Sequence, residues 1–123
     1  MLANVNWPAV LLGTAAAYGL GMVWFGKLFG TAWAKGSHGI QPPQSPPVPA
    51  MAVQLVGTFL MAWLIGATET QQAIWAAVVA IVAIASLQLA GGLFSQKSTV
   101  AAAIDGGYVV AAGVLMIVAQ GIL

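Results

Sequence analysis

The chain has 123 residues, of which 61% are hydrophobic and only 4% are charged. A soluble domain devotes about a quarter of its residues to charge, so this composition excludes a soluble globular fold. Three lysines and no arginine cannot neutralise a run of phosphates, which excludes nucleic acid as a partner. No cysteine is present and His38 is the single histidine, which excludes thiolate and multi-histidine metal sites. We therefore expect a small integral membrane protein.

Four apolar stretches are long enough to cross a bilayer, for which a helix needs about 20 residues. They cover residues 8–25, 50–67, 73–94 and 100–122. None of them alternates in polarity, as the strands of a membrane β-barrel would. The sequence therefore predicts an all-α membrane protein, a single integral membrane domain over residues 1–123 with four transmembrane helices.

The first span has a clear start. Asn6 is a suitable N-cap, Trp7 suits the membrane interface, and Pro8 suits the first helical turn. No basic residue precedes the apolar run, so we expect a permanent anchor rather than a cleaved signal peptide.

A long loop, residues 26–49, follows the first span. Apolar residues recur at helical spacing in its first part, beside two lysines, which predicts a short amphipathic helix in the headgroup region, ended by residues 36–39. These apolar residues are Leu28, Phe29, Ala32 and Trp33. The rest, residues 41–49, contains five prolines in nine residues and is expected to be polyproline II. We interpret it as a stiff tether leading to the second span; a ligand for a proline-recognition domain is the alternative. His38 is expected to be solvated.

The lysines predict the orientation. Lys27, Lys35 and Lys97 all lie in the two loops on one side of the membrane, residues 26–49 and 95–99. By the positive-inside rule this side is cytoplasmic, and both termini face outward.

Tryptophan side chains prefer the membrane interface, and all of those in this chain fall near predicted span ends. We expect an aromatic belt of interface anchors: Trp7, Trp24, Trp33, Trp63 and Trp75.

Small residues recur four apart in every span, a spacing that allows close helix packing in lipid. The pairs are Ala15 with Gly19, Ala17 with Gly21, Ala62 with Gly66, Ala76 with Ala80, and Ala102 with Gly106.

Polar residues inside the spans form the candidate site. Tyr18, Gln54, Gln88 and Asp105 each lie four to seven residues from the lysine-rich end of their span. At about 1.5 Å per residue, they share a depth of roughly 6–10 Å in the inner leaflet. Tyr108 is one turn beyond Asp105 on the same helix face. We therefore predict that these five side chains meet in an intramembrane polar cluster.

Asp105 has three interpretations. An ionisable residue inside a membrane is by default a functional-site hypothesis, here a proton or cation site with the neighbouring polar residues as partners. Interhelical hydrogen bonds that fix the register of the bundle are the second interpretation. The third is that the last span begins at Asp105, which would then cap the helix.

Three segments resemble a known pattern: N-W-P-A-V at residues 6–10, G-x-x-W-F-x-x-x-F-G-x-x-W at residues 21–33, and D-G-G-Y at residues 105–108. The chain resembles the bacterial domain-of-unknown-function family numbered 1761, which consists of small four-span membrane proteins. Phe25, where tyrosine is usual, and the proline-rich segment depart from that pattern. The resemblance implies the architecture and no catalytic residue.

The expected function is that of a small accessory or structural subunit in the bacterial inner membrane, packed against a larger complex such as an energy-transducing one. The alternative is a small oligomeric transporter or channel that uses Asp105 as a proton or cation site. No enzyme activity is expected, because Asp105 and Glu69 lie on opposite sides of the membrane and cannot act as an acid–base pair. No metal or cofactor is expected. Membrane lipids and a larger complex or a second copy are the expected partners, and aromatic grooves offer room for a lipid or a carotenoid.

Overall fold

The computed structural model describes residues 4–40 and 47–123. This part of the chain is helical and contains no strand. The elements are α1 (Trp7–Val23), a π-helical turn η1 (Trp24–Leu28), α2 (Gly30–Gly36), α3 (Val48–Thr70), α4 (Ile74–Phe94) and α5 (Thr99–Ile122). Four helices are long and apolar enough to cross a membrane: α1 with η1, α3, α4 and α5. The predicted all-α fold with four candidate spans is confirmed.

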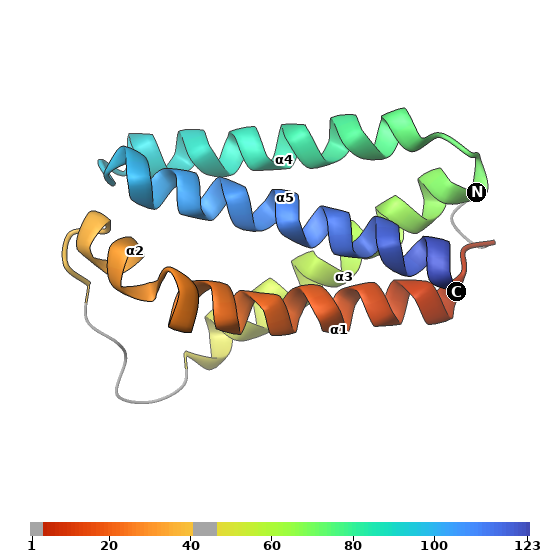
Figure 1. Cartoon of the computed structure of the whole chain (residues 1–123), viewed down its shortest axis with the longest axis horizontal. Coiled ribbons are helices and arrows are strands. Elements are labelled where there is room, and N and C mark those ends of the chain that lie inside the picture. The colour runs from red at the N-terminus through yellow and green to blue at the C-terminus, as the bar shows by residue number, and fades with distance from the viewer. Residues whose placement is uncertain (1–3, 41–46) are drawn as a thin grey trace.

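Helices α1, α4 and α5 run side by side, α3 crosses obliquely behind them, and the short α2 packs against α5 and η1 at one end (Figure 1). That end carries Lys27, Lys35 and Lys97, and we refer to it as the lysine end; α1 finishes there and α5 begins there. Helix α5 contacts α1, α2, α3 and α4 and is the centre of the bundle. Accordingly 50% of its apolar stretch is buried, against 28% or less in the other three spans.

Side-chain caps fix two helix starts. The Asn6 side chain accepts a hydrogen bond from the Ala9 backbone N–H at 3.2 Å, as predicted for the start of α1. The Ser98 hydroxyl accepts one from the Ala101 N–H at 3.0 Å and caps α5. Because α5 begins at Thr99, the interpretation of Asp105 as the cap of the last span is wrong.

Small residues allow the helices to approach closely. A Cβ at Gly13 of α1 would lie 3.3 Å from the backbone of Met116 in α5, and a Cβ at Gly92 of α4 would lie 2.9 Å from Ala102. Ala17 and Ala62 are fully buried among these contacts. In contrast, Gly19 has open space around it, so the pair with Ala15 faces out of the bundle.

The segment between α1 and α3 differs from the prediction in two places. The interfacial helix begins only at Gly30, because residues 24–28 continue α1 as a π-helical turn. The polyproline prediction is wrong at Val48 and Pro49, which form the first turn of α3, where proline needs no hydrogen-bonding N–H. Residues 41–46 of the predicted proline-rich tether lie outside the described residues.

Candidate functional site

A pocket of about 730 Å³ lies near the lysine end, between all four long helices and α2. We call it the polar pocket. All five residues of the predicted polar cluster line it, together with aromatic, methionine and small residues. The lining consists of Tyr18, Gly21, Met22, Phe25, Gly26, Trp33, Pro47, Ala50, Met51, Gln54, Gln88, Asp105 and Tyr108.

Asp105 is held by two side chains from outside its own helix. Its Oδ1 accepts a hydrogen bond from the Trp33 indole N–H at 2.9 Å, and its Oδ2 pairs with the Lys97 ammonium at 3.0 Å. The same ammonium lies 4.9 Å from the centre of the Trp33 ring, within cation–π range. These three residues form what we call the Asp105 cluster, in which both carboxylate oxygens are engaged and the charge is balanced.

One backbone hydrogen bond and one side-chain contact hold α2 in place beside this cluster. The Ser98 N–H donates to the Gly36 carbonyl at 2.8 Å, and the His38 Nε2 lies 2.8 Å from the Ser95 carbonyl. A Cβ at Gly36 would overlap the Ser98 hydroxyl and lie 2.7 Å from the Ala101 methyl, so only glycine permits this approach. The position of Trp33 on the pocket wall thus depends on the docking of α2 onto the start of α5.

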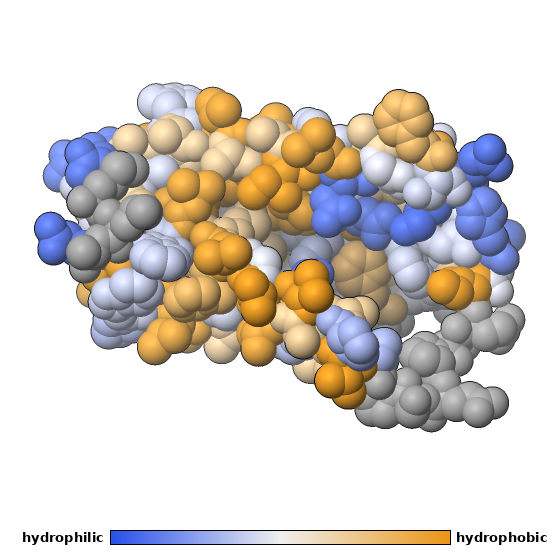
Figure 2. Space-filling model, turned by 180° about the vertical axis from the view of Figure 1, so that it is seen from behind, coloured by the Kyte–Doolittle hydropathy of each residue, from blue (hydrophilic) through white to orange (hydrophobic). Residues whose placement is uncertain are grey.

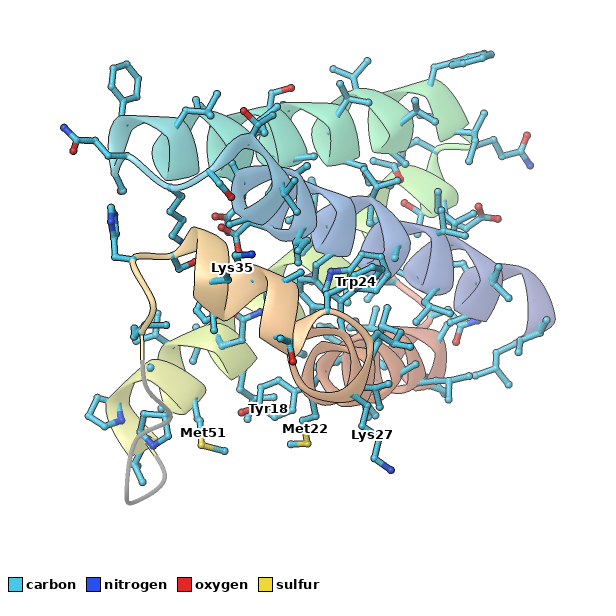
Figure 3. All side chains as sticks on the ribbon, turned by 60° about the vertical axis from the view of Figure 1, so that its left-hand side comes forward. Tyr18, Met22, Trp24, Lys27, Lys35 and Met51 are labelled. Atoms are coloured by element: carbon cyan, nitrogen blue, oxygen red, sulfur yellow. The ribbon has the colours of Figure 1, made fainter. Side chains whose placement is uncertain are left out.

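The π-helical turn η1 forms the wall on the α1 side. Trp24 donates its indole N–H to the Ile104 carbonyl at 3.0 Å, which ties the end of α1 to α5. The centre of the Phe25 ring lies 5.6 Å from the centre of the Trp33 ring and 5.4 Å from the centre of the Tyr108 ring, and both pairs meet edge to face. Lys27, on the same turn, points away from the bundle, whereas Trp24 points toward α5 (Figure 3). Short π-helical turns are frequent at functional sites because they change which side chains face inward.

The two tyrosines use their hydroxyl protons within the bundle. Tyr108 is buried and donates to the Ala17 carbonyl at 2.6 Å. Tyr18 donates across to the Met51 carbonyl at 3.2 Å, and its ring points from α1 toward α3, with Met22 alongside (Figure 3). Both phenol oxygens keep lone pairs that can accept a hydrogen bond from a ligand.

Gln54 of α3 and Gln88 of α4 both line the polar pocket and are exposed in the isolated chain. Gln54 lies close to the Tyr108 hydroxyl. Each primary amide offers two N–H donors and a carbonyl acceptor, more capacity than a single neighbour can use. At membrane depth such groups are costly unless a polar partner reaches them.

A second cavity of about 270 Å³ lies beside the polar pocket between α3 and α4, over α5. We call it the α3–α4 groove. It shares Gln54, Gln88 and Tyr108 with the polar pocket. The remaining lining is Val53, Gly57, Thr58 and Met61 of α3, Ile84 of α4, and Val109, Ala112 and Met116 of α5. From behind, a band of hydrophilic residues runs toward the lysine end beside a hollow in an otherwise hydrophobic face (Figure 2).

The predicted interface anchors lie in three different settings. Trp24 and Trp33 use their indole N–H groups inside the protein, as described above. Trp7 and Trp63 are in tilted ring contact at the opposite end, with ring centres 5.4 Å apart, and Phe59 stacks on Trp7 and contacts Trp63. Trp75 is 77% exposed.

The sequence pattern did not predict the two partners of Asp105, Trp33 and Lys97. Lys97 is predicted only as a cytoplasmic loop charge that sets the topology, whereas in the structure its side chain is only 23% exposed and is paired. Lys27 and Lys35 are exposed, in agreement with their expected place at the water boundary. A signal was available for Lys97, because it lies only eight positions before Asp105 and on the same predicted membrane side.

The sequence matches the family described as "Protein of unknown function (DUF1761)" over residues 8–121. Neither a curated protein nor a solved structure matches the chain.

Proposed function

Because the chain belongs to the DUF1761 family of unknown function, we propose its function from the geometry of the polar pocket. We propose that it is a small non-catalytic membrane protein that binds an amphiphilic molecule taken from the surrounding lipid. Its four apolar helices support a multi-pass membrane protein. The expected orientation, with both termini outside, rests on the lysine distribution and is tested below. The bacterial inner membrane is the location that the family resemblance implies.

One observation carries the proposal: five polar side chains from four helices line a single pocket in a chain that is only 4% charged. Polar residues inside membranes are rare, and they face the bundle interior or a cavity. Here they alternate with aromatic and methionine side chains on the pocket wall, which is the lining typical of small-molecule sites.

Binding fits this lining better than catalysis does. Asp105 is the one carboxylate among the described residues that line the pocket, and Trp33 and Lys97 occupy its two oxygens. A general acid or base must be within hydrogen-bond reach of the substrate and free to exchange a proton. The pocket therefore offers hydrogen bonds and apolar surface.

The same contacts weigh against the alternative of a transporter with Asp105 as the proton or cation site. A transported cation would have to displace Lys97 from the carboxylate and from the face of Trp33. Proton uptake by proteoliposomes that carry the wild type or Asp105→Asn tests this alternative, which requires a loss of uptake in the variant.

An accessory role in a larger complex is our second proposal. A Cβ added at Gly57 of α3 or at Gly91 of α4 would meet nothing within 4 Å, so a partner helix could approach both helices closely. Purification in a mild detergent tests it: a stoichiometric protein partner supports the proposal, and a monodisperse single chain contradicts it.

The binding proposal is tested by filling the pocket. Gly26 lines it and has open space around it, so Gly26→Leu should fit the fold and occupy the cavity. Gly19→Leu is the matched control, because Gly19 also has open space but lies outside the lining. We expect native mass spectrometry to find an amphiphile on the wild type and on Gly19→Leu, and little on Gly26→Leu. Equal retention by both variants contradicts the proposal.

A further inference from the structure

We infer that the ligand of the polar pocket is an uncharged amphiphile with one slender tail. Its hydrogen-bonding head lies among Gln54, Gln88 and the phenol oxygens of the two tyrosines, and its tail lies in the α3–α4 groove. The inference rests on the proposed binding function and adds the chemical class and orientation of the ligand.

The charges of the pocket lining are balanced, and this favours a ligand whose head is uncharged. Asp105 is the one formally charged residue among the described residues that line the pocket, and its charge is matched by Lys97 at 3.0 Å. Lys27 and Lys35 are exposed and lie outside the lining, so neither supplies a counter-charge. An ionised head would lose its hydration on entry without gaining an opposite charge, and this loss is large in an apolar environment.

The hydrogen-bonding groups that remain suit hydroxyl, ester or amide groups. The amides of Gln54 and Gln88, which come from two different helices, supply both donors and acceptors to the pocket. The hydroxyl protons of Tyr18 and Tyr108 are already given to backbone carbonyls, so these phenols contribute acceptors. A head that both donates and accepts hydrogen bonds, such as a glycerol ester, matches this set.

The α3–α4 groove provides the path for the tail. It meets the polar pocket at Gln54, Gln88 and Tyr108, so a molecule whose head is bound there can extend directly into the groove. Its floor is the apolar surface of α5, and Gly57 leaves one wall without a side chain. With a volume of about 270 Å³ against about 730 Å³ for the pocket, the groove is the smaller part, and this limited volume favours a single chain over two.

Three photoactivatable probes that share one diazirine-labelled oleoyl chain test the class of the head. Their heads are a glycerol ester, a carboxylate and an amine, and each is added to intact protein in phosphatidylcholine vesicles at neutral pH. We expect the glycerol probe to label the groove residues Met61, Ile84 and Met116. Labelling by the two charged probes should be weaker by about tenfold or more, because they lose hydration without compensation.

The outcomes separate the inference from the proposed function. Equal or stronger labelling by a charged probe overturns the uncharged class and leaves the binding function standing. No saturable labelling by any probe overturns both.

Matched variants test the orientation. Gly57→Leu places a side chain in the groove, whereas Gly91→Leu adds the same side chain at an equally open position outside it. We expect the first to abolish labelling at Met61 and Ile84 and the second to preserve it. Gln54→Leu with Gln88→Leu should remove the preference for the glycerol head while the chain remains folded. Unchanged labelling in Gly57→Leu, or an unchanged preference in the glutamine variant, overturns the orientation.

Discussion

Lys97 and Asp105 form an ion pair at 3.0 Å in which the side chains are only 23% and 14% exposed. Lys97 precedes α5, Asp105 lies in the second turn of that helix, and Trp33 covers the pair from α2. The pair therefore joins the loop before α5, α5 itself and α2 at one edge of the polar pocket. It also neutralises the one carboxylate that the described pocket lining contains.

A double-mutant cycle measures the coupling energy between Asp105 and Lys97. Asp105→Asn keeps an acceptor for the Trp33 indole but removes the charge, and Lys97→Met removes the ammonium. We expect each single variant to lower the free energy of unfolding in detergent, with a coupling energy of about 1–2 kcal/mol, because each leaves a partly buried polar group without its partner. Glu69→Gln, in an exposed position at the other end, is the control. Additive effects of the two substitutions would show that the pair contributes nothing.

The buried hydroxyl of Tyr108 gives a second prediction. Tyr108→Phe removes its hydrogen bond to the Ala17 carbonyl, which is buried between α1 and α5. We expect a loss of about 1 kcal/mol in the free energy of unfolding, as is typical for a buried hydrogen bond. Tyr18→Phe removes an exposed bond and should have a smaller effect. A larger loss in Tyr18→Phe than in Tyr108→Phe would contradict this assignment.

The contact between α2 and the start of α5 gives a third prediction. In Gly36→Ala the added methyl overlaps the Ser98 hydroxyl and the Ala101 methyl, so α2 must move away. We expect a destabilisation of about 1–3 kcal/mol, together with faster hydrogen exchange of the α2 amides. Gly91→Ala adds the same methyl in open space within a helix and should be neutral or slightly stabilising. Unchanged exchange in α2 of Gly36→Ala would argue against close docking of this helix.

The lysine distribution predicts the orientation. The chain has no cysteine, so single cysteines can be introduced without background labelling. Thr31→Cys in α2 and Gln71→Cys after α3 are both exposed and lie at opposite ends of the bundle. In spheroplasts we expect a membrane-impermeant maleimide to label Gln71→Cys, and to reach Thr31→Cys only after permeabilisation. The reverse labelling pattern would show that the orientation in the membrane is opposite to the predicted one.

Much of the fold could be predicted from hydropathy. The bounds of the spans agree within a few residues, because the length of an apolar stretch and the capping residues Asn6 and Pro8 fix where a membrane helix runs. The convergence of the five polar residues on one pocket followed from the constant rise of a helix, which converts position along a span into depth.

The contacts of Asp105 could not be obtained in that way. Depth does not fix the rotation of a helix or the direction of a loop. Average rules therefore predict only an interface position for Trp33 and a cytoplasmic loop position for Lys97. The π-helical turn that begins at Trp24 could not be predicted either, because composition does not show whether a backbone N–H bonds to the carbonyl four or five residues before it. Both features depend on tertiary contacts between segments that are far apart in sequence: 72 positions separate Trp33 from Asp105, and 80 separate Trp24 from Ile104.

Whether the polar pocket holds an amphiphile is tested most directly by an experimental structure of the protein in lipid nanodiscs supplemented with 1-oleoylglycerol. We expect an elongated density whose head contacts Gln54 and Gln88 and whose tail follows the α3–α4 groove toward Met61. A pocket closed by its own side chains, or one that contains only water, would contradict the proposed binding function.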